Sequence, residues 1–258
     1  MHLPIHAIQL DSVWENKAAS FAKVRTLLAA QPPEPGGLLI LPEMFATGFS
    51  CAVEITAEPE SGETETFLKA LAQEHRCGVI GGVIVKPTSE GRALNQALAF
   101  SSEGTLLARY TKRRPFSLGG ESAVHAAGDT PVVFDFQGLK VGLLVCYDLR
   151  FPELARDLAR LGAEVIVCIA AWPVKRISHW MTLLQARAIE NQAYVVGVNR
   201  TGHEPDYSYN GRSLIVDPHG VIIADAGERE QLLHSQLDAI WVKAWREQFP
   251  ALRDAGLA

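Results

Sequence analysis

One cysteine stands where a nucleophile could act. Residues 140–145 form a nearly continuous apolar run, typical of a strand buried on both faces, and the run stops at Cys146. Pro152 favours a helix start, so the pattern predicts a sharp strand-to-helix turn around this thiol. The partial positive charge of a helix N-terminus favours a thiolate. The alternative is a buried structural cysteine, because free Cys is among the most often buried residue types.

A glutamate and a lysine occupy equivalent places in the pattern. Glu43 follows a short apolar strand predicted at residues 38–41, and Lys112 lies two residues past a strand predicted at 106–110. Ligands and catalytic groups collect at the C-terminal ends of strands in α/β sheets. There Glu43 could act as a general base, and Lys112 could stabilise an oxyanion and a nearby thiolate. The alternatives are a solvated loop glutamate and an exposed basic cluster at residues 112–114.

Together these three side chains would suffice for acyl transfer at an amide. Cys146 would attack the carbonyl carbon, and Glu43 would take up the thiol proton and pass it to departing ammonia. Lys112 and the backbone N–H of Tyr147 would stabilise the tetrahedral oxyanion, and Glu43 would then activate water to release the acid. Spacing alone does not select this trio from the other Glu and Lys residues of the chain.

The elements that must position these residues alternate between helices and strands, with hairpins mixed in. Hydrophobic periodicity predicts helices at residues 16–30, 63–75, 152–161, 177–191 and 237–249. It predicts strands at 3–10, 38–41, 79–85, 94–100, 106–110, 132–136, 140–146, 165–170, 194–199, 214–216 and 221–224. No break in composition separates domains, so residues 1–258 are predicted to form one α/β domain. Its tail, from about residue 238, is expected to pack on the body or on a partner subunit.

Composition narrows the classes of function. The chain has 258 residues and a formal net charge of -5, and its basic residues are scattered outside 112–114, which argues against nucleic acid as a partner. No apolar segment approaches the length of a membrane span or resembles a signal peptide. The four cysteines show no CxxC spacing and the histidines no HExxH, which argues against zinc and for reduced thiols in the cytoplasm.

Four segments resemble the motifs of a known enzyme family. They are residues 41–45 (LPEMF), 110–113 (YTKR), 144–152 (LVCYDLRFP) and 186–192 (ARAIENQ), and they are similar, in the family's order, to the nitrilase superfamily of carbon–nitrogen hydrolases. The resemblance implies a Glu43–Lys112–Cys146 triad and no metal or organic cofactor. It also implies an α/β fold, a four-layer αββα sandwich of two mixed sheets covered by helices, and homodimers paired through their sandwiches.

Within the superfamily the chain resembles omega-amidases most closely, which hydrolyse the terminal amide of 2-oxoglutaramate and 2-oxosuccinamate. Residues 43–49, 146–151 and 171–173 carry this likeness. The family's second acidic residue corresponds to Glu121, which would orient the lysine or help to position substrate; a plain loop glutamate is the alternative. The chain departs from similar sequences at residues 114–115, where Arg and Pro replace His and Leu. The proline stiffens the loop that leads to Glu121, and the arginine adds charge near the pocket mouth.

The same resemblance indicates candidate substrate-binding residues. Phe49, Phe116 and Trp172 could wall a small acyl pocket. The distal carboxylate of such a substrate needs a cation, because a buried carboxylate without a partner is costly. Arg150 is the first candidate and Arg176 the second. For Arg150, a structural salt bridge to a helix-end carboxylate is the alternative.

Other interpretations stay open. An N-carbamoyl amine or amino-acid hydrolase, an aliphatic amidase or a nitrilase would keep this chemistry and change the substrate. A non-catalytic binding protein on the same fold would normally have lost part of the triad, and all three residue types are present. A nucleotide-binding domain would need GxGxxG or GxxxxGK[ST] after a strand, and the chain has neither.

Overall fold

Two six-stranded sheets form the centre of the molecule. A computed structural model describes residues 2–87 and 91–257. The first sheet contains, in spatial order, β14 (Gln231–Asp238), β1 (His2–Gln9), β2 (Leu38–Ile40), β3 (Gly78–Val85), β4 (Leu94–Phe100) and β5 (Leu106–Thr111). Strands β1, β2 and β3 run parallel, and the remaining neighbours are antiparallel. The sheet is therefore mixed.

The second sheet has a similar plan. It contains, in spatial order, β13 (Ile222–Asp225), β12 (Leu214–Val216), β9 (Tyr194–Asn199), β8 (Val165–Ala170), β7 (Leu139–Val145) and β6 (Val133–Phe136). Strands β7, β8 and β9 are parallel, and hairpins complete both edges. A separate two-stranded ribbon consists of β10 (Thr201–His203) and β11 (Ser208–Asn210).

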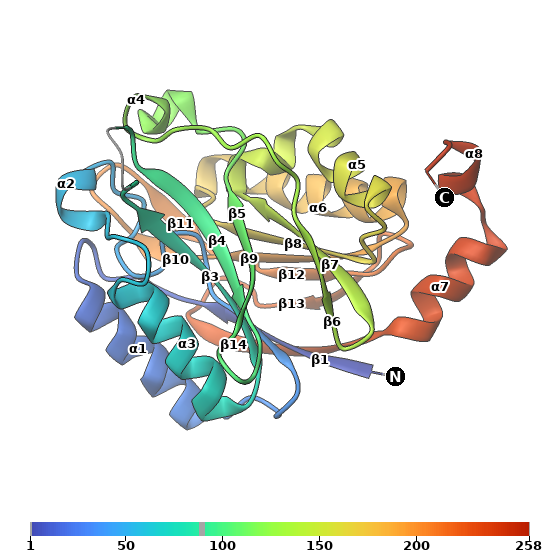
Figure 1. Ribbon diagram of the computed structural model, residues 1–258, viewed down its shortest axis with the longest axis horizontal. Coiled ribbons are helices and arrows are strands. Elements are labelled where there is room, and N and C mark those ends of the chain that lie inside the picture. The colour runs from blue at the N-terminus through green and yellow to red at the C-terminus, as the bar shows by residue number, and fades with distance from the viewer. Residues whose placement is uncertain (1, 88–90, 258) are drawn as a thin grey trace.

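Helices cover the outer face of each sheet and give the molecule four layers. The longer helices are α1 (Lys17–Ala30), α3 (Glu63–His75), α5 (Pro152–Arg160), α6 (Ile177–Asn191) and α7 (Ala239–Gln248). The short ones are α2 (Val53–Thr56), α4 (Glu121–Val124), α8 (Ala251–Asp254) and the 3₁₀ turns η1 (Ser117–Gly119), η2 (Cys146–Arg150) and η3 (Val174–Arg176). In Figure 1, α1 and α3 lie on one side of the paired sheets and α5 and α6 on the other. The predicted α/β fold class, a four-layer αββα sandwich, is confirmed.

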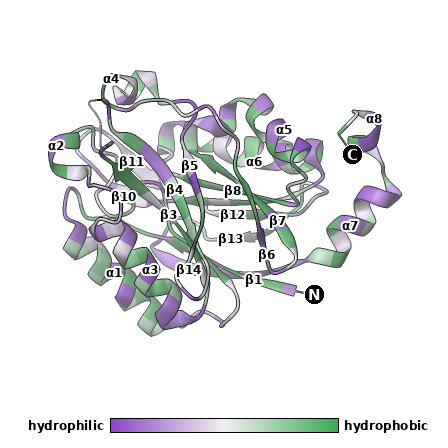
Figure 2. Ribbon diagram, viewed as in Figure 1, coloured by the Kyte–Doolittle hydropathy of each residue, from purple (hydrophilic) through white to green (hydrophobic). Residues whose placement is uncertain are grey.

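Burial of apolar side chains explains why the layers associate. The strands of both sheets are largely hydrophobic, whereas the covering helices alternate hydrophobic and hydrophilic residues (Figure 2). Phe21 and Leu28 of α1 and Phe67 and Leu71 of α3 pack in one apolar cluster on the first sheet. A second cluster joins residues of both sheets to α5 and α6. Burial of this kind is the main force that stabilises a sandwich.

The C-terminal part of the chain differs from the prediction. Residues 231–238 form β14, which pairs with all eight residues of β1, and the helix expected at 237–249 begins only at Ala239. Asp238 caps this helix by accepting hydrogen bonds from the backbone N–H groups of Ile240 and Trp241. The strand was missed because polar residues interrupt its apolar pattern, whereas pairing along β1 satisfies its backbone.

The tail after β14 contacts the body of its own chain. The Arg246 guanidinium donates hydrogen bonds to the backbone carbonyls of Ala163 and Gln192, at 2.6 and 2.9 Å. Trp241 and Trp245 pack against the His219 ring, with ring centroids 5.0 and 4.0 Å apart. These contacts fix α7 beside the second sheet. Throughout the described part of the chain, every helix is too short or too polar to cross a membrane.

Candidate active site

Three strand ends bring Glu43, Lys112 and Cys146 together. Glu43 lies three residues after β2, Lys112 directly follows β5, and Cys146 directly follows β7. The first two therefore come from one sheet and the cysteine from the other. The two sheets pack face to face, so the cluster lies between them at one end of the sandwich.

The turn at Cys146 is sharper than the sequence indicates. Cys146 has φ of +47°, a left-handed conformation that is rare for residues other than glycine, and it opens the 3₁₀ turn η2. The α-helix α5 starts at Pro152, as predicted. The Asp148 carboxylate accepts hydrogen bonds from the Val145 backbone N–H and the Tyr110 hydroxyl, at 3.1 and 2.7 Å. The turn is thus tied to β5, the strand that directly precedes the lysine.

Asp148 is a residue that the sequence analysis missed. It is fully buried, and it accepts a third hydrogen bond from the Arg114 backbone N–H at 2.8 Å. Burial raises the pKa of Asp148 to about 6, against the opposing effects of Lys112 and of its hydrogen-bond donors. The Arg114 side chain packs over the Phe151 ring, 5.5 Å from its centroid, and is not among the residues that line the pocket. The Arg114 charge therefore does not form part of the wall of that pocket.

The Cys146 thiol is not held as a thiolate by its surroundings. Burial, and next the Glu43 carboxylate, raise the pKa of Cys146 well above its ordinary range. This overturns the expectation that a helix N-terminus would ionise the thiol. The Cys146 Sγ lies 3.8 Å from the Ala171 carbonyl oxygen. A reaction at this sulfur therefore needs a nearby group to accept its proton.

Two carboxylates flank the lysine in a dry cluster. The Lys112 Nζ donates to Glu43 Oε1 at 2.8 Å and to Glu121 Oε2 at 2.7 Å, and all three side chains are at most 1% exposed. The second Glu43 oxygen, Oε2, accepts from the Ala171 backbone N–H at 2.8 Å. The structure places Glu121 in contact with Lys112, the position that the resemblance indicated for it.

Electrostatics keep this cluster charged. Burial disfavours the Lys112 ammonium, but Glu43 and Glu121 outweigh it and raise the pKa of Lys112 well above its usual value. Burial likewise opposes the Glu121 carboxylate, yet the Lys112 charge and hydrogen bonds from Asn95, Lys112 and the Phe116 backbone N–H lower the pKa of Glu121 overall. An ammonium has three N–H groups, and two of those on Lys112 are used by these carboxylates. Among the described residues, the third has no hydrogen-bond acceptor.

Asn95 completes the cluster, and the sequence analysis missed it. Its side-chain amide lies on β4 beside Lys112 and donates to both Glu43 and Glu121, at 2.7 Å each. A signal was available, because Asn95 and Gln96 are two adjacent amides inside an otherwise apolar strand. Buried amides need hydrogen-bond partners, and the acceptors for the Asn95 amide are the two carboxylates.

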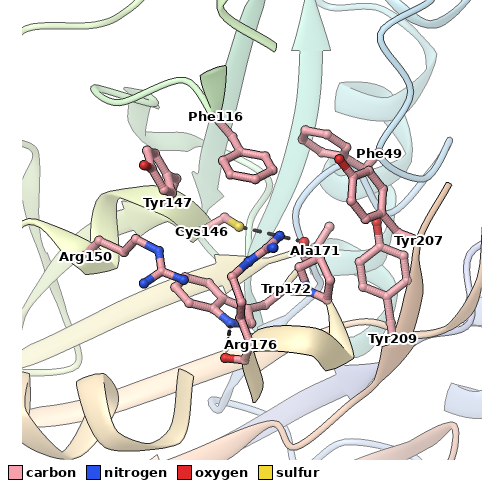
Figure 3. A pocket seen from close by; sticks show the side chains of 11 residues that line it. Phe49, Phe116, Cys146, Tyr147, Arg150, Ala171, Trp172, Arg176, Tyr207 and Tyr209 are labelled. Atoms are coloured by element: carbon pink, nitrogen blue, oxygen red, sulfur yellow. Dashed lines mark hydrogen bonds between the residues drawn. The ribbon is translucent and has the colours of Figure 1, made fainter. Parts of the chain in front are cut away.

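A pocket opens over Cys146. It spans about 350 Å³ when the open solvent at its mouth is included, and Figure 3 shows the Cys146 sulfur at its centre, with Phe116 on one side and Trp172 on the other. The other residues around it are Phe49, Tyr147, Arg150, Ala171, Pro173, Arg176, Tyr207 and Tyr209. All five residues predicted from the sequence to bind substrate therefore line one cavity. The prediction missed Tyr207 and Tyr209, because their ribbon carried no motif or apolar run.

Two arginines face this pocket without a carboxylate partner in the described chain. The Arg150 guanidinium lies 4.6 Å from the centre of a Trp172 ring and contacts His179 Nδ1 at 3.2 Å. The salt bridge considered for Arg150 is absent from the part of the chain described. The Arg176 guanidinium lies 5.3 Å from the Phe116 ring centroid. Burial, and then the neighbouring Arg176, lower the pKa of Arg150, so the two positive charges are close enough to repel each other.

The described residues contain no cluster of side chains suited to bind a metal ion. Within residues 2–87 and 91–257, no group of three or more His, Cys, Asp or Glu side chains is arranged to hold a metal ion. The acidic groups at Cys146 are instead engaged by Lys112 and Asn95. What the cluster can do is accept and return a proton next to a nucleophilic sulfur.

Comparison with known proteins agrees with this geometry. The family model for carbon-nitrogen hydrolases matches residues 5–247. The chain is 32% identical to a 2-oxoglutaramate amidase of Bacillus subtilis, over 98% of each chain, and 37% identical to the omega-amidase YafV of Yersinia enterocolitica, over 98% of this chain and 96% of the other. Among solved structures, XC1258 of Xanthomonas campestris, a CN-hydrolase superfamily protein with an arsenic adduct in its active site, has 32% identity and a TM-score of 0.90, covering 98% and 97% of the two chains. The resemblance noted in the sequence is confirmed: the chain belongs to the carbon–nitrogen hydrolase family and is a hydrolase of amide carbon–nitrogen bonds.

Proposed function

We propose that the protein is an omega-amidase, which hydrolyses the terminal amide of 2-oxoglutaramate or 2-oxosuccinamate to the dicarboxylic acid and ammonia. One observation carries the choice of substrate. The pocket over Cys146 has two guanidinium groups in its wall and, among the described residues that line it, no acidic side chain. Such a pocket favours an amide that carries a carboxylate at its other end. The names of the B. subtilis and Y. enterocolitica relatives point to the same substrate class.

The walls of the pocket also suit a short acyl chain. Most of the side chains around it are aromatic, and apolar walls with a few polar groups are typical of small-molecule sites. Phe49, Phe116 and Trp172 would pack against the short carbon chain, with Arg150 or Arg176 bound to the distal carboxylate. This arrangement would aim the terminal amide at the Cys146 sulfur.

Acylation would begin with proton transfer from Cys146 to Glu43. The sulfur forms a bond to the amide carbonyl carbon while the C=O electron pair moves onto oxygen. The third N–H of Lys112 and the backbone N–H of Tyr147 stabilise this oxyanion. The oxyanion then reforms the carbonyl, the C–N bond breaks, and Glu43 returns its proton to the departing ammonia. The product is a thioester on Cys146.

Deacylation repeats the sequence with water. Glu43 takes a proton from the water molecule as its oxygen attacks the thioester carbon, and the second oxyanion uses the same donors. Its collapse breaks the C–S bond, and the proton returns to the Cys146 sulfur. In this account Glu121 holds the lysine in place and does not exchange protons with the substrate. No cofactor takes part in these steps.

A panel of substrates tests the proposal. We expect ammonia release from 2-oxoglutaramate or 2-oxosuccinamate at a kcat/KM at least about 100-fold above that for neutral aliphatic amides, because a charge-assisted contact to the carboxylate is lost in the latter. N-carbamoyl amino acids and nitriles should react more slowly still. Preferential turnover of an N-carbamoyl compound, a nitrile or a neutral amide would reject the omega-amidase assignment.

A further inference from the structure

The side-chain amide of Asn95 links the two carboxylates of the active-site cluster. It has two N–H groups, and it gives one to Glu43 Oε1 and the other to Glu121 Oε1, at 2.7 Å each. Lys112 Nζ bridges the same two carboxylates from its own position. Glu43, Lys112, Glu121 and Asn95 therefore form a closed ring of hydrogen bonds. Asn95 itself is 1% exposed, so water does not compete for these donors.

The two carboxylate oxygens of Glu43 accept different hydrogen bonds. Oε1 accepts from both Lys112 and Asn95, whereas among the described residues Oε2 accepts one hydrogen bond, from the Ala171 backbone N–H. Ala171 also contacts the Cys146 sulfur through its carbonyl oxygen, so the residue that donates to Oε2 is also a neighbour of the thiol. An oxygen that already accepts two hydrogen bonds is the poorer site for an incoming proton.

The ring also holds an excess of negative charge. Two buried carboxylates face a single ammonium, and like charges in one dry site raise each other's affinity for a proton. Hydrogen bonds from a neutral donor favour the ionised form of a carboxylate without adding a further charge. Asn95 is the side chain that supplies such donors to both carboxylates. Without it, one of the two would hold a proton over a wider range of pH.

We propose that Asn95 is a positioning residue that keeps Glu43 and Glu121 ionised and directs the thiol proton to Glu43 Oε2. This inference rests on the proposed role of Glu43 as the base. Its signature is a change in pH dependence, because a residue that only supports the fold would lower activity equally at every pH. Asn95→Leu removes both donors and keeps the branched shape of the side chain.

The test is the pH profile of kcat/KM for ammonia release from 2-oxoglutaramate. The acidic limb reports ionisation of the free enzyme's base, and in Asn95→Leu we expect it to move up by about one pH unit or more. Gln96→Leu is the matched control. Gln96 is the next residue of β4 and is equally buried, but its amide bonds to Thr111 and Arg109 instead of the cluster. Its acidic limb should stay in place.

A second variant and a second readout protect the test. Asn95→Thr keeps one hydroxyl donor and should shift the limb by an intermediate amount if Asn95→Leu fails to fold. The rate of alkylation of Cys146 by iodoacetamide, followed by mass spectrometry across pH, needs no substrate and should show the same upward shift. If the wild type hydrolyses none of the amides, the proposed function fails, and the alkylation profile still tests Asn95. An unmoved limb in folded Asn95→Leu and Asn95→Thr would overturn the inference.

Discussion

At the scale of single residues, the mechanism depends on a neutral thiol beside a charged cluster. Many reactive cysteines are ionised in advance by nearby positive charge. Here burial and Glu43 keep the proton on Cys146, so the nucleophile must be generated when Glu43 accepts that proton. Lys112 does not compensate for this at the sulfur, because its charge is shared between two carboxylates. The reactivity of the thiol should consequently depend on whether Glu43 is ionised and able to accept the proton.

The two pocket arginines give the first prediction. Arg150→Gln and Arg176→Gln should each lower kcat/KM for 2-oxoglutaramate by roughly 10- to 100-fold, because a hydrogen bond to a charged group contributes about 1.5–3 kcal/mol. A neutral aliphatic amide should lose less than about 3-fold. Arg114→Gln is the control, since that guanidinium packs on Phe151 outside the pocket. Equal losses for charged and neutral substrates would show that the arginines only support the pocket wall.

Some of this detail was accessible from the sequence and some was not. Glu43, Lys112 and Cys146 stand in motifs that resemble those of a known family, and this resemblance singles them out. Asn95 and Tyr209 act through contacts that depend on how β4 packs on β5 and where the β10–β11 ribbon lies. The thiol's protonation state was mispredicted for a similar reason. It depends on burial and on a carboxylate more than 100 positions away in the sequence, which outweigh the local turn.

At the scale of elements, a glycine on β3 allows Glu43 to approach the sheet. A Cβ at Gly82 would lie 2.7 Å from the Glu43 Cα and nearer still to the Met44 backbone nitrogen. Met44 has φ of +47°, so the chain turns sharply here and has little room to move. The adjacent Gly81 differs, because a Cβ there would press on the flexible end of the Leu68 side chain, 2.6 Å away.

These two glycines give the second prediction. Gly82→Ala should push the Glu43 backbone away and lower kcat/KM by roughly 10- to 100-fold, since small displacements of catalytic groups have large effects. Gly81→Ala should lower the unfolding free energy by about 1–3 kcal/mol through overpacking, while kcat/KM changes by less than about 2-fold. Kinetics and urea unfolding of both variants measure this. Comparable kinetic losses in the two variants would refute a specific role for Gly82.

The pairing of β1 with β14 contains a titratable contact. His6 Nδ1 lies 2.8 Å from His234 Nδ1, and His6 Nε2 accepts a hydrogen bond from the Glu34 backbone N–H at 3.0 Å. His6 is buried, at 3% exposure. Burial, and next His234, lower the pKa of His6 to about 4. The folded protein therefore keeps this ring neutral at pH values where an unfolded chain would protonate it.

The third prediction follows from that difference. Between about pH 6.5 and pH 4 the unfolded chain binds a proton at His6 that the folded chain does not, so the unfolding free energy falls as the pH falls through this window. The full effect is roughly 3 kcal/mol. Urea unfolding at several pH values should show a smaller slope in His6→Leu than in wild type. Exposed His203→Leu should keep the wild-type slope; a His6→Leu slope equal to that of wild type would disprove the assignment.

The sequence predicts elements well where apolar periodicity is strong. Strands such as β7 and β8 are continuous apolar runs, and α1 has a side-chain cap at Asn16, which accepts from the Ala19 backbone N–H. Strand β14 lacks such a pattern, because its stability comes from backbone pairing with a strand more than 200 residues away. The β10–β11 ribbon likewise has no apolar pattern that would predict it. Local periodicity carries no information about backbone pairing between distant segments.

At the scale of the whole molecule, the outer layer of the second sheet carries exposed apolar side chains. Ile189 on α6 and Val221 beside β13 are each 56% exposed. The Gln185 amide donates to the Gly220 carbonyl at 2.8 Å, which joins α6 to the turn that carries Val221. We propose that two copies of the chain pair through this face of their sandwiches. Burying such a patch would remove apolar area from water.

This pairing gives the fourth prediction. Ile189→Glu and Val221→Glu should shift the protein from dimer towards monomer in light scattering coupled to size-exclusion chromatography, because a charge in an apolar interface is costly. Ile55→Glu is the control, since Ile55 is 63% exposed on α2, in another part of the molecule. A wild-type protein that elutes as a monomer at micromolar concentration would contradict the proposal, whatever the variants do.

The central claim is that Cys146 carries the acyl group, and one measurement tests it most directly. Ammonia release from 2-oxoglutaramate should be followed for wild type and Cys146→Ala side by side, with hydroxylamine added to intercept a thioester as the hydroxamate. Wild type should form ammonia and, with hydroxylamine, the hydroxamate. Cys146→Ala, with an unchanged circular dichroism spectrum, should form neither, because covalent catalysis is lost. Substantial ammonia release by folded Cys146→Ala would contradict the account.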